Sequence, residues 1–191
     1  MILSNEAILE ALADGRLQIE PPPIDTATSA VDLTLGPLLQ IPRSGLSIAI
    51  DFGRGSVADN LTAISESVDL RSASPFRLER GQFVLGQTEE VVSFPLRPDT
   101  PESARHRPCL AGRVEGKSSR ARFGLLVHFT APTIHAGWSG RITLEMMNLG
   151  PAPLILEAGM RICQLVVEEV VGVPLADPSS FQGQRTPAGQ P

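Results

Sequence analysis

The segment from Gly116 to Arg122 brings together side chains that can bind an anion. It holds one lysine, two serines and two arginines within seven positions: Gly116, Lys117, Ser118, Ser119, Arg120, Ala121 and Arg122. Ammonium and guanidinium groups donate charge-assisted hydrogen bonds, and the guanidinium fork matches the oxygens of a phosphate. A solvated basic turn would contain the same residues. In a chain of net charge −5, however, this concentration of cations and hydroxyls favours anion binding.

Residues 111–118 also have the spacing of a Walker A motif, with alanine in the first place and Gly-Lys-Ser at the end. A P-loop requires a glycine-rich loop whose N–H groups surround the phosphates, and a long helix after that loop. Here Arg-Val-Glu fills the loop, and a run with the composition of a strand soon follows at 125–129. The context therefore argues against a P-loop ATPase or kinase.

A second chemical segment extends from 130 to 145. Its glycines and the only tryptophan of the chain, Trp138, indicate a turn. The residues after the turn alternate polar and apolar types as in a strand, which puts Arg141, Thr143 and Glu145 on one face. Glu145 is therefore a candidate proton acceptor with polar neighbours, although an exposed surface strand would show the same pattern.

The sequence gives poor support for a catalytic metal or a nucleophilic serine. The three histidines, His106, His128 and His135, lack the spacing of metal ligands. A zinc-dependent cytidine deaminase needs His-x-Glu and a later Pro-Cys-x-x-Cys. No His-x-Glu occurs, and the cysteine motif is incomplete because Cys109 and Cys163 lie far apart. No Gly-x-Ser-x-Gly sequence marks a hydrolase nucleophile. If the protein deaminates a base, we expect it to do so without zinc.

Composition indicates an ordinary globular enzyme. The chain has 191 residues, is 42% hydrophobic and has a pI near 5.2, which argues against a general nucleic-acid binder. Two cysteines without paired spacing favour a reducing compartment. The first residues do not resemble a signal peptide, and no apolar run approaches the roughly 20 residues that cross a bilayer. We expect a cytoplasmic protein that acts away from membranes and nucleic acids.

One short helix followed by many short strands is the organisation that the sequence predicts. Ser4 is a suitable N-cap for a helix over 5–13, and Gly15 ends it. Short apolar or alternating runs then stand between turn residues, at 31–35, 46–50, 76–78, 82–85, 91–94, 125–129, 141–146, 154–156 and 161–167. This spacing predicts an all-β barrel, sandwich or jelly roll.

Three segments lack periodicity and are expected to be irregular. Residues 53–67 are polar and small, residues 97–107 are a dense mixture of charges, and residues 174–191 are rich in Pro, Gly, Gln and Ser. The last of these reads as a frayed terminus or as a flexible lid over a site. We therefore expect one β domain over 1–173 and a flexible C-terminal tail over 174–191.

The order of these segments resembles that of the dCTP deaminases, which share their scaffold with the trimeric dUTPases. The resemblance runs from the first residues to 181–184 and rests on ordered motifs at 29–36 (SAVDLTLG), 115–125 (EGKSSRARFGL), 127–131 (VHFTA), 136–145 (AGWSGRITLE) and 158–165 (AGMRICQL). Several motifs in one order are more specific than any one of them. The resemblance implies a distorted jelly-roll subunit of the dUTPase-like type and a homotrimer with nucleotide sites between subunits.

The resemblance also implies roles for individual residues. Glu145 falls on the family's catalytic glutamate, Ser118 and Arg122 on essential active-site residues, and Ala131 on the residue whose backbone holds the attacking water. Other substrate contacts fall on Lys117, Ser119, Arg120, Ala121, His135, Trp138, Thr143, Leu144, Gln164 and Gln184, where Thr143 and Leu144 contribute strand backbone. No cofactor is implied for catalysis; Mg²⁺ would accompany the triphosphate of dCTP or dUTP, and dTTP would act as an inhibitor.

The chemistry of deamination suits this set of residues. Water is a poor nucleophile at neutral pH, so its attack on C4 of cytosine needs a base to accept its proton. A proton must then reach N3 and later the leaving ammonia, and one glutamate can make these transfers in sequence, an effect typically worth about 10²–10⁴ in rate. Ser118 and Arg122 would position and polarise the reacting groups.

One position departs from the family's pattern and leaves alternatives open. The family usually has Ile-Asp-Pro-Gly where this chain has Ile-His-Ala-Gly at 134–137. The missing aspartate contacts the sugar 3′-hydroxyl and, in dUTPases, serves the hydrolytic water, so His135 favours deamination alone. The alternatives are a dUTPase, a bifunctional enzyme that also releases pyrophosphate, and a non-catalytic nucleotide-binding regulator on the same scaffold.

Overall fold

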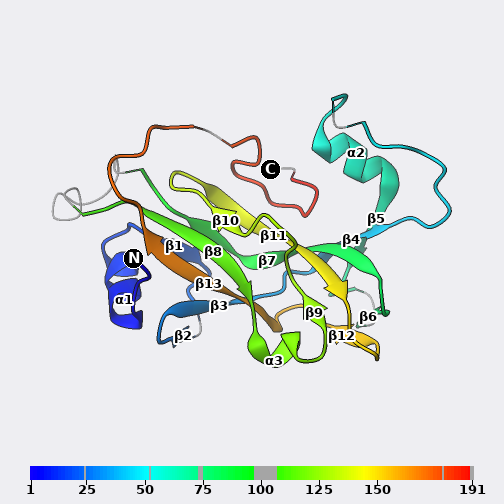
Figure 1. Ribbon diagram of the computed structural model, residues 1–191, viewed down its shortest axis with the longest axis horizontal. Coiled ribbons are helices and arrows are strands. Elements are labelled where there is room, and N and C mark those ends of the chain that lie inside the picture. The colour runs from blue at the N-terminus through cyan, green and yellow to red at the C-terminus, as the bar shows by residue number, and fades with distance from the viewer. Residues whose placement is uncertain (24, 52, 73–74, 97–106, 178, 190–191) are drawn as a thin grey trace.

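Two antiparallel β-sheets make up the body of the protein, and the helices lie at its periphery (Figure 1). The computed structural model describes all residues except 24, 52, 73–74, 97–106, 178 and 190–191, so the charged segment expected at 97–107 lies outside the described residues apart from Arg107. The first sheet has the order β5-β4-β7-β11-β9, with β1 paired to β7. Its strands are β1 (Gln18–Glu20), β4 (Leu38–Pro42), β5 (Ser65–Asp69), β7 (Phe83–Ser93), β9 (Leu125–Leu126) and β11 (Ser139–Asn148).

The second sheet has the order β10-β8-β13-β3-β2. Its strands are β2 (Thr26–Ala27), β3 (Ala30–Thr34), β8 (Leu110–Gly116), β10 (Thr133–Ile134) and β13 (Arg161–Glu169). A separate ribbon pairs β6 (Phe76–Leu78) with β12 (Leu154–Leu156). The strands confirm the all-β class, and the two sheets agree with the expected distorted jelly roll.

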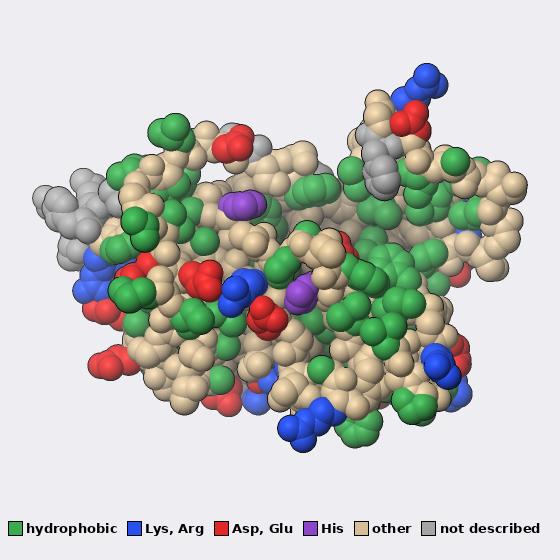
Figure 2. Space-filling view, viewed as in Figure 1, with side chains coloured by type: hydrophobic (Ala, Val, Ile, Leu, Met, Phe, Trp, Pro, Cys, Tyr) green, Lys and Arg blue, Asp and Glu red, His purple; other side chains and the backbone are tan. Residues whose placement is uncertain are grey.

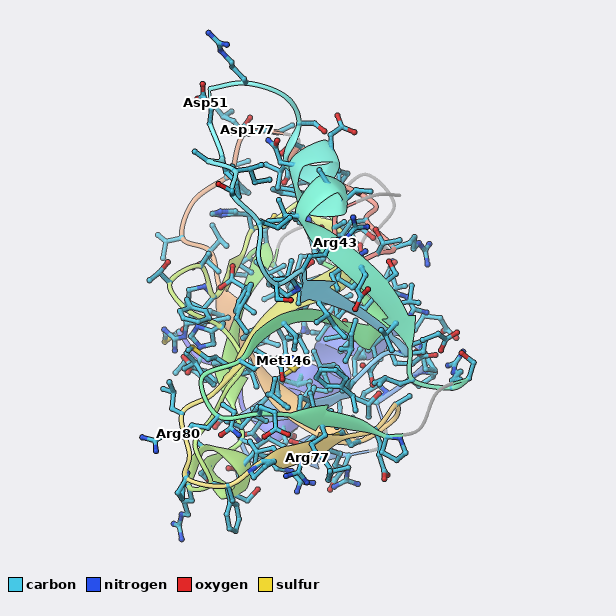
Figure 3. The ribbon with its side chains drawn as sticks, turned by 90° about the vertical axis from the view of Figure 1, so that its right-hand side faces the viewer. Arg43, Asp51, Arg77, Arg80, Met146 and Asp177 are labelled. Carbon is cyan, nitrogen blue, oxygen red and sulfur yellow. The ribbon has the colours of Figure 1, made fainter. Side chains whose placement is uncertain are left out.

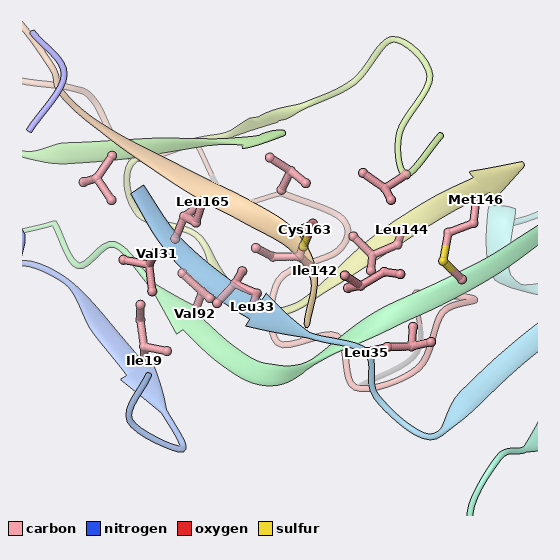
Figure 4. Packing of buried hydrophobic residues seen from close by; sticks show 14 of the residues in the cluster. Ile19, Val31, Leu33, Leu35, Val92, Ile142, Leu144, Met146, Cys163 and Leu165 are labelled. Atoms are coloured by element: carbon pink, nitrogen blue, oxygen red, sulfur yellow. The ribbon is translucent and has the colours of Figure 1, made fainter. Parts of the chain in front are cut away.

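The hydrophobic core lies between the two sheets. The strand β11 buries every second side chain along its length, as β geometry predicts for a strand with one face on the core. Ile142, Leu144 and Met146 of β11 are buried, and Figure 4 shows them with Leu33 and Leu165 of the facing sheet. Burying a side chain of this size stabilises the fold by about 1.5–3 kcal/mol. The predicted alternation along β11 is therefore confirmed.

The expected N-terminal helix is also confirmed, as α1 (Asn5–Ala13). The hydroxyl of Ser4 accepts a hydrogen bond of 3.3 Å from the backbone N–H of Ala7, which satisfies one of the free donors of the first turn. Ile8 and Ala11 are the buried residues of the helix. None of the helices in the described part of the chain is long and apolar enough to cross a membrane.

The prediction of an irregular segment at 53–67 is wrong, because these residues contain α2 (Val57–Ile64) and the start of β5. The hydroxyl of Ser56 accepts a hydrogen bond from the backbone N–H of Asp59 and caps the helix. Figure 3 shows the arm that carries α2 projecting from the body, with Asp51 at its outer end and Met146 within the body. No residue of α2 is buried, so the helix has fewer apolar residues than a helix of the hydrophobic core.

The prediction of a strand at 46–50 is also wrong. Leu46, Ile48 and Ile50 are exposed, and the segment has no partner strand, so its alternation does not lead to pairing. The strand expected at 125–129 is shorter than predicted, because β9 ends at Leu126. No strand was expected at β8, although β8 pairs with β13 along its whole length.

The runs expected at 82–85 and 91–94 belong to one strand, β7. Polar residues interrupt its periodicity where the register with β11 shifts. Glu90 is 5% exposed, and its carboxylate accepts hydrogen bonds from the backbone N–H and the hydroxyl of Thr34. The hydroxyl of Thr88 accepts a hydrogen bond from the backbone N–H of Ile142. These bonds offset the cost of burying polar groups in the middle of a strand.

Candidate active site

A cavity of about 740 Å³ lies between the first sheet, α2 and the C-terminal segment. Its lining comes from β7 and β11, the residues 128–138, the helix α2 and the residues 179–189. Figure 2 shows hydrophobic side chains gathered beneath the α2 arm, where the surface is hollowed. Because most of the lining is apolar, the few polar groups determine what the cavity can bind.

Glu145 is the only carboxylate among the described residues that line this cavity. It lies on the half-buried face of β11, opposite Leu85 of β7, as the alternation predicted. Its Oε2 accepts a hydrogen bond of 2.9 Å from the backbone N–H of Phe129. An ionised carboxylate only accepts hydrogen bonds, so the second oxygen can receive a proton from a bound molecule. The geometry suits a general base.

The turn before β11 brings Ala131, His135 and Trp138 to the same cavity. Trp138 is 8% exposed, and its carbonyl accepts a hydrogen bond of 3.0 Å from the N–H of Phe94, directly after β7. Gly137 has φ +89, and a β-carbon there would lie 3.0 Å from Leu96. Only glycine adopts such a backbone without strain, so the glycine holds Trp138 against the sheet.

The C-terminal segment runs along β11 and contributes Gln184 to the cavity. The backbone N–H of Arg141 donates to the carbonyl of Gln184 at 2.9 Å. In return, the Gln184 amide donates to the carbonyl of Arg141 at 2.7 Å and to the hydroxyl of Thr143 at 3.2 Å. Gln184 is 6% exposed, so these bonds are sheltered from water. The tail therefore contacts the strand that carries Glu145.

The cationic segment lies outside the cavity of its own chain. Lys117 precedes α3 (Ser118–Ala121), and the residues Ser118, Ser119, Arg120, Ala121 and Arg122 are all exposed. None of these six residues lines the cavity. Residues 111–116 belong to β8, and the helix after them has 4 residues. A strand and a single helical turn therefore stand where a P-loop would have a glycine-rich loop and a long helix.

Two further predicted residues also stand apart from the cavity. The side chain of Leu144 is fully buried and belongs to the core, so only its backbone is available to a ligand. Gln164, on β13, donates a hydrogen bond to Asp32 and lies with Lys117 on the second sheet's side. The predicted residues thus divide between a cavity group (Ala131, His135, Trp138, Thr143, Glu145 and Gln184) and a group near α3.

Part of the cavity wall consists of residues that the sequence did not indicate. Val57, Leu61 and Ile64 of α2 line it, and their i, i+4, i+7 spacing behind a Ser56 cap was the available signal. His128 lines it as well; its Nε2 is 3.9 Å from the Glu115 carboxylate, and its buried Nδ1 has no partner among the described residues. Its ring can therefore offer that nitrogen to a ligand.

The described residues contain no group of three or more His, Cys, Asp or Glu side chains arranged to hold a metal ion. Cys163 is fully buried on β13, and burial raises the pKa of its thiol. The nearby carboxylates of Glu90 and Asp32 raise that pKa further, while the ammonium of Lys117 opposes them. Cys163 is therefore a neutral core side chain at physiological pH.

Known proteins resemble this chain in sequence and in fold. A family model described as dCTP deaminase-like matches residues 2–170. The dCTP deaminase of Rhodospirillum rubrum is 38% identical over 175 residues, which cover 90% of this chain and 84% of that protein. A protein of Mycolicibacterium paratuberculosis named dCTP deaminase, dUMP-forming, is 37% identical over 197 residues, with 98% of this chain and 93% of that protein covered.

A similar solved structure is the 2′-deoxycytidine 5′-triphosphate deaminase from Agrobacterium tumefaciens. It has a TM-score of 0.62 at 22% identity, and the match covers 88% of this chain and 48% of that chain. This chain thus spans about half the length of that one, and the two share a fold. The protein therefore belongs to the same all-β fold class as this deaminase. By the match of its sequence, the chain belongs to the dCTP deaminase-like family.

Proposed function

We propose that the protein hydrolyses the exocyclic amine of dCTP to give dUTP and ammonia. The observation that carries the proposal is Glu145, the single carboxylate of the described cavity lining, in a chain that belongs to the dCTP deaminase-like family. A base in a largely apolar cavity is available to a bound pyrimidine and is little competed for by water. The family membership supplies the substrate class that the cavity alone does not identify.

In the proposed mechanism Glu145 moves protons and forms no covalent bond. It accepts a proton from water as the oxygen attacks C4, and it gives that proton to N3. It then takes the proton of the new C4 hydroxyl and passes it to the amino group, which leaves as ammonia while C4 becomes a carbonyl. The backbone of Ala131 would hold the water, and the N–H of Phe129 keeps one Glu145 oxygen in place throughout. Water and dCTP are thereby converted to dUTP and ammonia with no external oxidant or reductant.

Ser118 and Arg122 would enter the site from a second copy of the chain. Ser118 on α3 and Arg122 directly after it are exposed outside their own cavity, so we propose a homotrimer in which α3 of one subunit completes the cavity of the next. Lys117, Ser119, Arg120, Ala121 and Gln164 would then approach the nucleotide from the same side. Such sharing would make activity depend on assembly.

The remaining nucleotide contacts would come from the cavity itself. Thr143 and the backbone of Leu144 would meet the base, His135 the sugar, and Trp138 and Gln184 the surrounding wall. We propose that residues 174–191 act as a cover that is separate from the β domain over 1–173. Mg²⁺ would arrive bound to the triphosphate oxygens as part of the substrate, and dTTP would compete for the same site.

A second candidate is a bifunctional enzyme that also releases pyrophosphate and gives dUMP. A relative that matches 98% of this chain has a name that describes dUMP formation. Against it stands His135, which lines the cavity where an acid would be needed to activate a second water. A simple dUTPase would require the same acid.

Separation of the products decides among these functions. Purified protein is incubated with dCTP and Mg²⁺, and nucleotides are resolved by anion exchange while ammonia and pyrophosphate are measured. Accumulation of dUTP with ammonia supports deamination alone, whereas dUMP with pyrophosphate supports the bifunctional reaction. Pyrophosphate from dUTP without any attack on dCTP would identify a dUTPase. Binding without turnover would replace the proposal with a regulatory role.

A further inference from the structure

Asp32 accepts hydrogen bonds from two side chains that come from different strands. Its Oδ1 lies 2.5 Å from Nζ of Lys117 and 3.0 Å from Nε2 of Gln164. Its Oδ2 lies 3.6 Å from a guanidinium nitrogen of Arg161. One carboxylate therefore gathers three donors at the end of the second sheet where α3 begins.

The strand order explains how these groups meet. Asp32 on β3 and Gln164 on β13 are directly opposite each other. Lys117 follows β8, which pairs with β13 on its other edge. The lysine stem must therefore reach across β13 to contact Asp32, and the contact joins three adjacent strands. Lys117 is also the residue before the first turn of α3, so its position sets where that helix starts.

The pair of Lys117 and Asp32 is sheltered from solvent. The two side chains are 18% and 11% exposed, so salt screens their attraction less than that of a surface pair. Arg120 and Arg122 differ from Lys117 in this respect. Both are exposed, and no carboxylate of the described residues lies within ion-pair distance of either. The cations around α3 thus divide into one that is held within the chain and two that are available to an external anion.

We propose that Asp32 is a positioning residue, which anchors Lys117 and Gln164 and thereby fixes the start of α3. Lys117 then acts as an anchor, and the phosphates of the nucleotide are met by Arg120 and Arg122. The role of Asp32 towards the nucleotide rests on the proposed function, whereas the anchoring contact is independent of it.

The effect of Asp32→Asn on KM has opposite signs for the two roles of Lys117. If Asp32 is an anchor, its loss lets α3 move, and KM for dCTP rises about tenfold while kcat also falls, because Ser118 moves with the helix. If Lys117 is a phosphate ligand that Asp32 restrains, the same change frees the ammonium and lowers KM. A lowered or unchanged KM overturns the proposal, as does a fall in kcat alone with a lower melting temperature.

Asp25→Asn is the matched control. Asp25 is an exposed carboxylate 3.7 Å from the same Arg161, but among the described residues it forms no ion pair or hydrogen bond with Lys117 or Gln164. The substitution removes the same charge from the same neighbourhood. We expect KM, kcat and the melting temperature of this variant to match those of the wild-type protein. A KM increase equal to that of Asp32→Asn would mean that net charge, and not anchoring, sets nucleotide binding, and would overturn the proposal.

The single lysine permits a test that needs no turnover. Lys117 is the only lysine of the chain, so an amine reagent such as trinitrobenzenesulfonate modifies only this side chain and the N-terminus. Modification at 117, measured by mass spectrometry against the N-terminal amine, should be slow in the wild-type protein and at least tenfold faster in Asp32→Asn, roughly the loss of one charged hydrogen bond. Equal rates overturn the anchoring contact. A wild-type protein that protects Lys117 but leaves dCTP unchanged refutes only the proposed function.

Discussion

The backbone N–H of Phe129 donates a hydrogen bond of 2.9 Å to Oε2 of Glu145. The bond links the segment after β9 to the middle of β11, and Phe129 itself packs against Phe83 with ring centroids 5.6 Å apart. The aromatic contact and the hydrogen bond together fix the distance between that segment and the sheet. The catalytic candidate is thus oriented by backbone before any nucleotide binds, which lowers the reorganisation needed for proton transfer.

Replacing Glu145 by glutamine should remove chemistry and preserve binding. The amide oxygen can still accept from the N–H of Phe129, so KM for dCTP should stay within about threefold, while kcat falls by about 10²–10⁴ because proton transfer is lost. Ammonia release measures kcat. Glu66→Gln, on the exposed edge of β5, is the control and should retain full activity. Normal turnover by Glu145→Gln would place the base elsewhere.

Replacing Gln184 by alanine should loosen the C-terminal segment. The change removes the two hydrogen bonds to Arg141 and Thr143, worth about 1–3 kcal/mol together. Trypsin cleavage after the exposed Arg185 should then accelerate about tenfold, because proteolysis follows the open population. Gln182→Ala, which loses one bond of 3.2 Å to Gly137, should accelerate it less. Equal cleavage in both variants would show that these Gln184 bonds do not hold the tail.

The Cys163 thiol should make stability fall in alkaline solution. Because burial raises its folded-state pKa above the unfolded value, the stabilisation is complete below about pH 8.5 and is lost as the pH rises further. By pH 10 the wild-type protein should lose about 2 kcal/mol more than Cys163→Ala does. Urea unfolding at pH 7 and pH 10 measures the difference, and a thiol reagent at pH 8 should leave Cys163 unmodified until urea is added. An equal loss of stability in the wild-type protein and in Cys163→Ala would show that ionisation of Cys163 does not cause the alkaline destabilisation.

Periodicity predicted those elements in which burial against the core is the dominant cause. The alternation of β11 and the capped α1 followed from the sequence, and with them the face on which Glu145 lies. The segment 46–50 alternates equally well but lacks a neighbouring strand, and α2 packs on a cavity wall instead of the core. Pairing and cavities are long-range properties, which a local pattern does not contain.

The same limit applies within the candidate site. The cavity residues Trp138 and Glu145 belong to one turn and the strand after it, so their proximity could be predicted from the sequence. Gln184 meets β11 from a tail without any period, and Asp32 meets Lys117 from 85 residues away. The resemblance to a family indicated Gln184 by its position in the sequence. Neither periodicity nor the resemblance indicated what Asp32 contacts.

The two serine caps should differ in what their loss does. Ser4→Ala removes the cap of α1, which buries Ile8 and Ala11, so the free energy of global unfolding should fall by about 1 kcal/mol. Ser56→Ala makes the same chemical change in α2, but no residue of α2 is buried. That helix should therefore open locally, with faster hydrogen exchange at 57–64 and an unchanged melting temperature. If both variants lower the melting temperature equally, α2 unfolds with the core, and the wall of the cavity is as rigid as its sheet.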